Sequence, residues 1–189
     1  MTAGKHDGAT ISVHQIHAGR IIRVNEETIR FPDGTIGHLD IVRHPGACAV
    51  LPVLSSATEP DPDLLLLRQY RHAAAEWLVE IPAGRKEAGE PPEQCARREL
   101  LEETGCAADE LTLLTTILTT PGFSDEIIHL FMATGLTMGE SRRESDEFIE
   151  VVPTRLSRAL GMIERGDIHD AKSATAILYA AQFRLLGHA

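Results

Sequence analysis

The sequence lacks any apolar run near the roughly 18 residues that a membrane-spanning helix needs. Its first ten residues, Met1–Thr10, are polar and contain glycine. They do not resemble a secretory signal peptide, and we expect them to fray. The sequence therefore predicts a protein that is neither inserted in a membrane nor exported.

Cysteine is scarce, and its arrangement is informative. Cys48, Cys95 and Cys106 are odd in number and form no C-x-x-C pair. A disulfide framework is therefore not expected, and a reducing cytoplasm is the natural location. We interpret each cysteine as a small buried apolar residue rather than a nucleophile.

Runs of lysine and arginine are missing too, and the formal net charge is −10. A nucleic-acid partner is not expected, because a polyanion would be repelled. Nine histidines are present, but none shows an H-E-x-x-H or similar ligand spacing, so we interpret them as surface residues. An anionic substrate would need a recruited cation, and a metal ion is the obvious candidate.

The length of 189 residues fits one domain, alone or with a short appendage, and 43% apolar residues suffice for a core. Strands and helices intermix without a strict βαβ rhythm, which predicts a mixed sheet covered by helices. We expect helices at 92–104, 156–165 and 171–186, and strands at 21–31, 37–42, 47–54, 64–69, 77–81, 111–118, 127–133 and 148–152.

Three glutamates carry the strongest chemical signal. Glu99, Glu102 and Glu103 have helical i, i+3 and i+4 spacing and project from one face. Such like charges destabilise a helix by roughly 0.2–0.5 kcal/mol per pair, so a bound cation would explain them. Ligation by oxygen alone suits Mg²⁺ or Mn²⁺ better than Zn²⁺. The alternative is a solvated acidic face with Arg97 and Arg98 nearby.

The surrounding segment resembles the Nudix box, G-x5-E-x7-R-E-U-x-E-E-x-G-U, where U is a bulky aliphatic residue. Only Cys106 departs from it, in a place that usually holds Ile, Leu or Val, and we expect slightly looser packing there. The positions that match are Gly84, Glu90, Arg98, Glu99, Leu100, Glu102, Glu103 and Gly105.

The resemblance implies roles for these residues. Glu99 and Glu103 would bind metal, Glu102 would assist or bridge, and the carbonyl of Ala83 would be a further ligand. Glu90 and Arg98 would brace the loop and helix by an ion pair.

Further segments extend the resemblance to the ADP-ribose pyrophosphatase branch of the family. It implies an α/β/α sandwich with a mixed sheet (residues 45–189), preceded by a small β appendage (residues 1–44). The appendage would pack across a homodimer and complete the partner's site. The segments are Arg68–Arg71, Glu80–Gly84, Pro121–Asp125, His44–Ala47 and Asp167–Lys172.

The same resemblance places four residues at the substrate. Arg71 would contact a phosphate, since a guanidinium binds phosphate oxygens in a bidentate manner. Glu80 would face the cleft, and Gly122 and Phe123 would line its ribose-phosphate side. The alternatives are an ion pair for Arg71, a salt bridge at a strand end for Glu80, and plain core packing for Phe123.

Base recognition is less clearly marked. Some relatives stack adenine on aromatic residues where this sequence has Ile21 and Leu39. Aliphatic contacts, Arg43 or His44 could hold the base instead. Asp40 aligns with a carboxylate that contacts the base edge.

The implied reaction is hydrolysis of ADP-ribose to AMP and ribose 5-phosphate. The resemblance places the general base just before a late strand, at Glu147, with Glu144 as the runner-up and Glu102 assisting. Alternatives are another nucleoside diphosphate derivative (a nucleotide sugar, a dinucleoside polyphosphate or a flavin dinucleotide) and a non-catalytic nucleotide-binding regulator. The intact glutamates argue against a pure binder.

Overall fold

The computed structural model describes residues 8–139 and 149–185. Within these ranges no helix is long and apolar enough to span a membrane. The chain divides into two compact units. One comprises Met1–Gly46 and Leu118–Ile127, and the other comprises Ala47–Ile117 and Ile128–Ala189.

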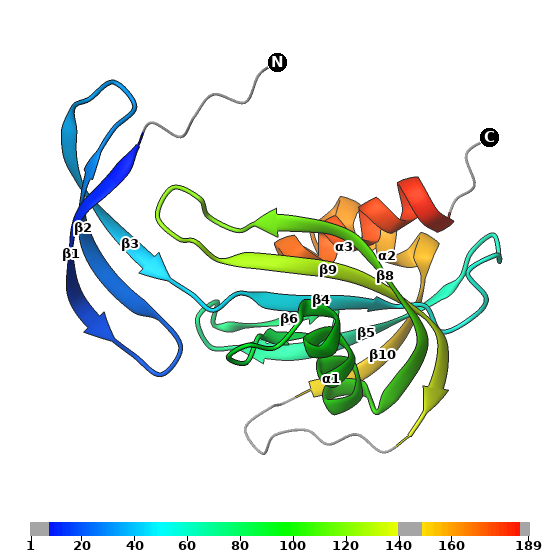
Figure 1. Cartoon of the computed structure of the whole chain (residues 1–189). Coiled ribbons are helices and arrows are strands. Elements are labelled where there is room, and N and C mark those ends of the chain that lie inside the picture. The colour runs from blue at the N-terminus through cyan, green and yellow to red at the C-terminus, as the bar shows by residue number, and fades with distance from the viewer. Residues whose placement is uncertain (1–7, 140–148, 186–189) are drawn as a thin grey trace. The chain divides into compact units, whose positions relative to one another are not determined.

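The first unit is built on a three-stranded antiparallel sheet (Figure 1), with the order β1 (Ala9–Ala18), β2 (Arg23–Arg30) and β3 (Ile36–Arg43). The sequence predicts β2, β3 and the turn between them, but not β1. Every residue of β1 is exposed, including the apolar Ile11, Val13 and Ile16, so this strand has no buried face. Its backbone pairing with β2 creates the strand.

The segment Leu118–Ile127 joins this unit through the end of β3. The Val42 amide donates to the Phe123 carbonyl at 2.7 Å, and Val42 pairs with Ser124 as an isolated bridge. The sequence does not assign this turn to the appendage, because contacts between distant residues leave no local pattern.

The second unit contains two sheets. One has the order β7-β4-β9-β8, and the other has the order β10-β5-β6. β4 runs parallel to β9 but antiparallel to β7, so the sheet is mixed, as predicted. The strands are β4 (Ala47–Pro52), β5 (Asp63–Arg71), β6 (Glu76–Glu80), β7 (Ala83–Arg85), β8 (Cys106–Leu118), β9 (Ile127–Met138) and β10 (Ile149–Arg155).

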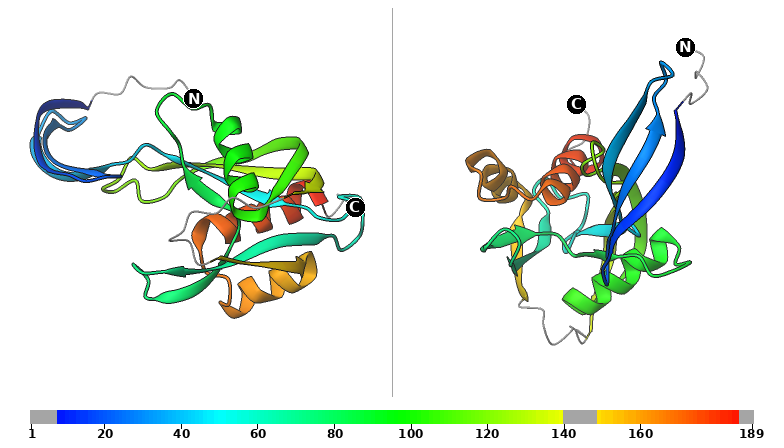
Figure 2. Two further views of the ribbon diagram at one scale, coloured as in Figure 1. Left: turned by 90° about the horizontal axis from the view of Figure 1, so that it is seen from below. Right: turned by 90° about the vertical axis from the view of Figure 1, so that its left-hand side faces the viewer.

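Helices cover both faces of the β4–β9 pair (Figures 1 and 2). Alternate residues of β4 point to opposite sides: Ala49 and Leu51 pack with α2 (Leu156–Arg165) and α3 (Ala171–Ala180), which the π-helical turn η1 (Ala181–Leu185) extends. Cys48 and Val50 pack with α1 (Pro92–Thr104). The predicted α/β/α sandwich is confirmed.

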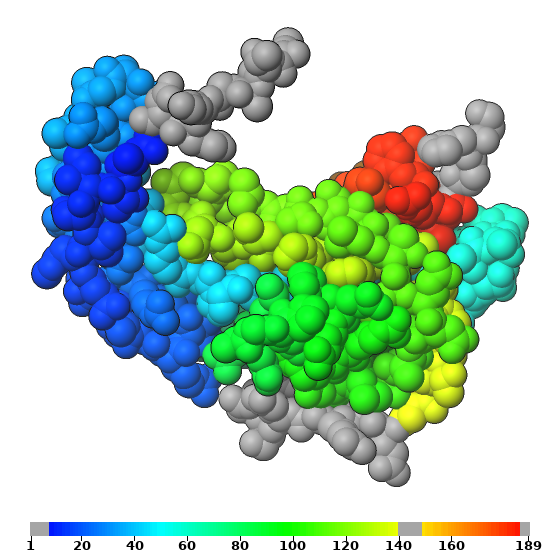
Figure 3. Space-filling model, in the orientation of Figure 1, coloured from blue at the N-terminus to red at the C-terminus, as the bar shows by residue number. Residues whose placement is uncertain are grey.

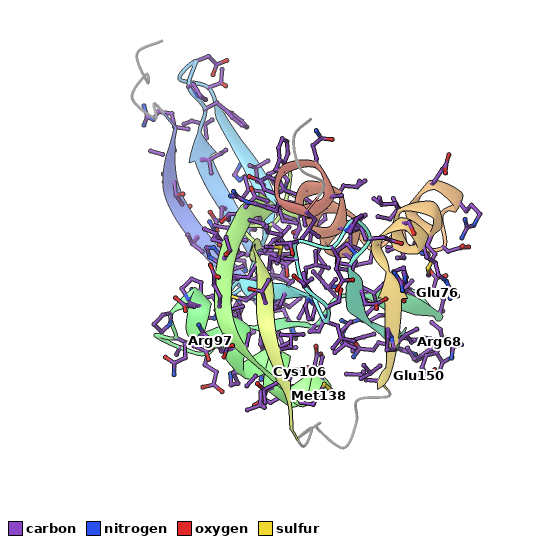
Figure 4. All side chains as sticks on the ribbon, turned by 90° about the vertical axis from the view of Figure 1, so that its right-hand side faces the viewer. Arg68, Glu76, Arg97, Cys106, Met138 and Glu150 are labelled. Carbon is purple, nitrogen blue, oxygen red and sulfur yellow. The ribbon has the colours of Figure 1, made fainter. Side chains whose placement is uncertain are left out.

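All three cysteines are buried free thiols, as predicted. Cys48 and Cys95 lie between β4 and α1. Cys106 opens β8, and its Sγ lies 3.1 Å from the Sδ of Met138 (Figure 4). Cys106 therefore packs as an apolar side chain where the motif has an aliphatic one.

Candidate active site

Helix α1 carries the glutamate cluster and is well defined at both ends. Proline as its first residue, Pro92, suits a first helical turn. At its end, Gly105 is left-handed (φ 75°) and donates its amide to the Leu101 carbonyl at 2.9 Å. Cys95, Ala96 and Leu100 anchor the inner face, and the outer face lies at the molecular surface (green in Figure 3).

Two of the glutamates turn inward and meet the backbone of β7. Glu103, only 2% exposed, accepts a hydrogen bond from the Ala83 amide at 2.8 Å. Glu99 lies so close to Gly84 that an added Cβ there would be 2.1 Å from its carboxylate. Glycine at position 84 is therefore required by the approach of Glu99, and both carboxylates converge on the Ala83–Gly84 backbone.

Arg98 binds three carboxylates at once. It donates to both oxygens of Glu90, at 2.9 and 3.0 Å, which confirms the predicted brace. It also donates to Glu99 at 2.6 Å and to Glu102 at 3.0 Å. Hydrogen bonds from Arg98 lower the pKa of Glu90 to about 2. The motif predicts the pair with Glu90 but not those with Glu99 and Glu102.

The glutamates therefore form two subsets. Glu99 and Glu102 share Arg98, whereas Glu103 binds the Ala83 amide. In the described part of the chain, no group of three or more His, Cys, Asp or Glu side chains is arranged to hold a metal ion. In this arrangement one arginine offsets part of the negative charge of Glu99 and Glu102.

Arg71 faces this cluster because of the alternation along β5. Arg68 lies on the opposite face of the strand, 4.6 Å above the Trp77 ring and 3.6 Å from Glu150 (Figure 4). Arg71 instead forms two hydrogen bonds of 2.8 Å with the carboxylate of Glu80. The hydrogen bonds that Arg71 donates to Glu80, and the charges of Glu80, Glu103 and Asp170, raise the pKa of Arg71.

Glu80 is the most deeply buried carboxylate of the site, with 1% exposure. Burial alone would raise its pKa, but hydrogen bonds from Arg71 and the charge of Lys172 hold the pKa below its ordinary value. The alternative of a salt bridge at the strand end thus describes Glu80 in this structure. Lys172, which contacts Glu80, was not predicted as a site residue, although the segment Asp167–Lys172 carries part of the family resemblance.

The remaining predicted substrate residues belong to the first unit. Asp40 is exposed on β3, opposite Glu26. Phe123 is 53% exposed, so the alternative of plain core packing is wrong. A Cβ on Gly122 would meet no described atom within 4 Å, so packing does not require glycine there.

Arg43 and His44, the two alternatives for holding the base, bind acidic residues of the first unit. Arg43 binds both oxygens of the buried Glu27 at 2.6 Å and donates to Asp125 at 3.1 Å. The His44 amide donates to Asp125 at 2.8 Å, and its ring lies 3.4 Å from Glu126. These contacts brace the turn that carries Phe123.

Residues 43–173, which include the glutamate helix and the backbone that it meets, match the NUDIX domain family. The chain belongs to the Nudix family.

Curated relatives cover nearly the whole Nudix chain. It is 43% identical over 172 residues to the ADP-ribose pyrophosphatase of Bacillus subtilis (strain 168), covering 90% of each. It is 37% identical over 181 residues to the methanol dehydrogenase activator of Bacillus methanolicus, covering 95% of each. A solved structure of an ADP compounds hydrolase superposes with a TM-score of 0.79 at 21% identity, covering 94% of each chain. This last likeness shows the fold.

The Nudix box therefore spans β7, the loop that follows it, and α1. Its glycines serve two different purposes: Gly84 admits a carboxylate, and Gly105 ends the helix. The predicted general base Glu147 and the runner-up Glu144 lie outside the described residues.

Proposed function

We propose that this Nudix protein hydrolyses the pyrophosphate of ADP-ribose, giving AMP and ribose 5-phosphate. The observation that carries the proposal is the convergence of Glu99 and Glu103 on the Ala83–Gly84 backbone. The guanidinium of Arg71 lies near enough for the charge of Glu103 to raise its pKa. Carboxylates that can bind a metal ion, next to a guanidinium that can bind phosphate oxygens, suit a site for a pyrophosphate and its metal ion. The relative named ADP-ribose pyrophosphatase supports the choice of substrate.

Mg²⁺, with Mn²⁺ as a substitute, is the metal that we propose. The donor set fits: Glu99, Glu102 and Glu103 offer only carboxylate oxygens, and the Ala83 carbonyl belongs to the backbone that they approach. Because Arg98 already binds Glu99 and Glu102, a cation would compete with it for those oxygens. When bound, Mg²⁺ would neutralise the pyrophosphate and activate a water.

The chain's own residues would do the remaining work. Arg71 would bind phosphate oxygens, and Glu80 would orient Arg71. Glu147 would take the proton of the attacking water as general base, with Glu144 as the runner-up and Glu102 assisting. Gly122 and Phe123 would line the ribose-phosphate side, and Asp40 would contact the base edge.

We further propose that the protein is a homodimer. Two observations support this: β1 is exposed along its entire length, and a three-stranded sheet is close to the minimum for independent stability. Light scattering at micromolar concentration should give twice the chain mass of 20.6 kDa, and a monomer would end this proposal. The three buried free thiols support a reducing cytoplasm as its location.

A substrate panel with Mg²⁺ tests the proposed reaction. ADP-ribose should be cleaved to AMP and ribose 5-phosphate faster than a nucleotide sugar, a dinucleoside polyphosphate or FAD. Products separated by chromatography identify the bond that is broken. Preferential cleavage of another substrate would replace ADP-ribose in the proposal.

A second candidate is a regulator of a dehydrogenase, which the relative named methanol dehydrogenase activator supports. The two candidates differ in what happens without a partner protein. A hydrolase cleaves the purified substrate alone, whereas a pure regulator binds the nucleotide and leaves it intact.

A further inference from the structure

A cluster of charged side chains around the buried Glu80 extends beyond Arg71 towards helix α3. Both carboxylate oxygens of Glu80 accept hydrogen bonds from Arg71, and Lys172 of α3 donates to Oε2 of the same carboxylate. Lys172 also donates to Asp170 at 2.9 Å, and its side chain is only 11% exposed. Residues from β5, β6 and the start of α3 are thus joined around one carboxylate.

The position of Lys172 is itself fixed by the first turn of α3. Asp170 caps this helix by accepting the Ser173 amide at 3.0 Å, and it also accepts the Ser173 hydroxyl. Fully buried, Ser173 Oγ accepts the Ile81 amide at 2.8 Å. Helix α3 is therefore tied both to the side chain of Glu80 and to the backbone of the next residue.

This arrangement restrains the guanidinium of Arg71. If Arg71 were the only cation bound to Glu80, the two side chains could move together. Lys172, which comes from α3, binds the same carboxylate and restricts that movement. Arg71 uses Nε and Nη2 for Glu80, so Nη1 is the nitrogen that lies outside this pair. A long side chain loses much rotamer freedom in such a bidentate contact, and the contact fixes the direction of the remaining donors.

We propose that Lys172 is a positioning residue, which holds Glu80 from α3 and thereby directs Arg71 towards a substrate phosphate. This inference rests on the proposed function, in which Arg71 contacts that phosphate. Lys172 acts through Arg71 and has no role of its own at the substrate.

A double-mutant cycle with Lys172→Met and Arg71→Met tests the proposal. Misplacement of a binding group costs up to about a hundredfold, so Lys172→Met should lower kcat/KM for ADP-ribose by about ten- to a hundredfold, mainly through KM. In the Arg71→Met background the same change should have almost no further effect, because the residue that it positions is gone. Independent, multiplying losses in the double variant would overturn the inference.

Two controls separate positioning from loss of structure. Arg165→Met removes an exposed cation that pairs with Asp167 just before α3, and it should leave kcat/KM unchanged. Thermal unfolding of each variant shows that assays are run on folded protein. If Lys172→Met does not fold, Lys172→Gln removes the charge but keeps a hydrogen-bond donor and completes the same cycle.

A readout without substrate keeps this inference separate from the proposed function. In nuclear magnetic resonance spectra, the Arg71 Nε–H signal, assigned by its loss in Arg71→Met, should exchange slowly with water because Glu80 is buried. Lys172→Met should speed this exchange or shift the signal, and an unchanged signal would overturn the inference. Failure of the wild type to cleave ADP-ribose would instead overturn the proposed function, while this spectrum still tests Lys172.

Discussion

Arg98 shows how a single residue holds the acidic helix together. It donates to Glu90 and also to Glu99 and Glu102, two of the three closely spaced glutamates of α1, and thus offsets part of the repulsion among them. The motif predicted its pairing with Glu90. The other two contacts depend on which way the guanidinium turns, and spacing along the sequence does not determine that.

The first prediction concerns the pH dependence of this brace. Glu90 has a folded-state pKa of about 2 against an ordinary value of 4.5. Its contribution to stability is therefore fully present above pH 4.5 and is lost as the pH falls towards 2. Glu90→Gln should lower the free energy of unfolding at pH 7 by about 1.5–3 kcal/mol, as expected for hydrogen bonds to a charged group.

Denaturant unfolding of wild type and Glu90→Gln across the acidic range measures this effect. The difference between the two proteins should shrink between pH 4.5 and 2. A difference that stays constant over this range, or that is absent at pH 7, would contradict the ion pair as the source.

The second prediction concerns Gly84. In Gly84→Ala the new Cβ would lie 2.1 Å from the carboxylate of Glu99, which must move away. That carboxylate is the end of a flexible side chain, so the fold should survive. The displacement should lower kcat/KM by about a hundredfold.

The matched control is Gly161→Ala in α2, where a Cβ would meet only the flexible end of Arg165. This variant should keep wild-type activity. Retained activity in Gly84→Ala would show that the position of Glu99 does not matter for the reaction.

At the scale of elements, sequence patterns predicted the helices and strands that have a buried face, and missed the fully exposed strand β1. Helix α1 was expected from its prolines and from Gly105, and it has those limits. Strand β9 was expected to end at Ala133 but continues to Met138 through Gly135, which has φ 66°. Gly135 lies so close to Asp109 of β8 that a Cβ would not fit there. This contact between strands is not visible in the sequence pattern.

The third prediction concerns the turn Leu118–Ile127. Asp125 accepts from Arg43 and from the His44 amide, and so holds the turn on β3. Asp125→Ala should therefore increase amide hydrogen exchange of the peptide around Phe123, because its local opening becomes easier. Glu110→Gln, an exposed change on β8, is the control and should leave this peptide unchanged.

Equal exchange in wild type and Asp125→Ala would mean that the backbone contacts of Val42 alone hold the turn. If the turn also binds substrate, as proposed, Asp125→Ala should raise KM for ADP-ribose more than it lowers kcat.

At the scale of the whole molecule, the long motif predicted the family and the sandwich, since its residues fix both a helix and its docking on a strand. What the sequence could not give was the clustering of Glu80, Arg71 and Lys172. These residues come from β5, β6 and α3, and only tertiary packing brings them together. The same reason explains why the turn at 118–127 joins the first unit.

The most direct test of the central claim, that Glu103 beside the Ala83 amide serves a metal-dependent hydrolysis, is the rate of AMP formation from ADP-ribose in wild type and Glu103→Gln. With Mg²⁺ the wild type should be active, excess EDTA should abolish its activity, and Glu103→Gln should be slower by about a hundredfold or more. Glu93→Gln, an exposed change on the same helix, should match the wild type. Full activity in excess EDTA, or a Glu103→Gln variant as fast as the wild type, would contradict the account.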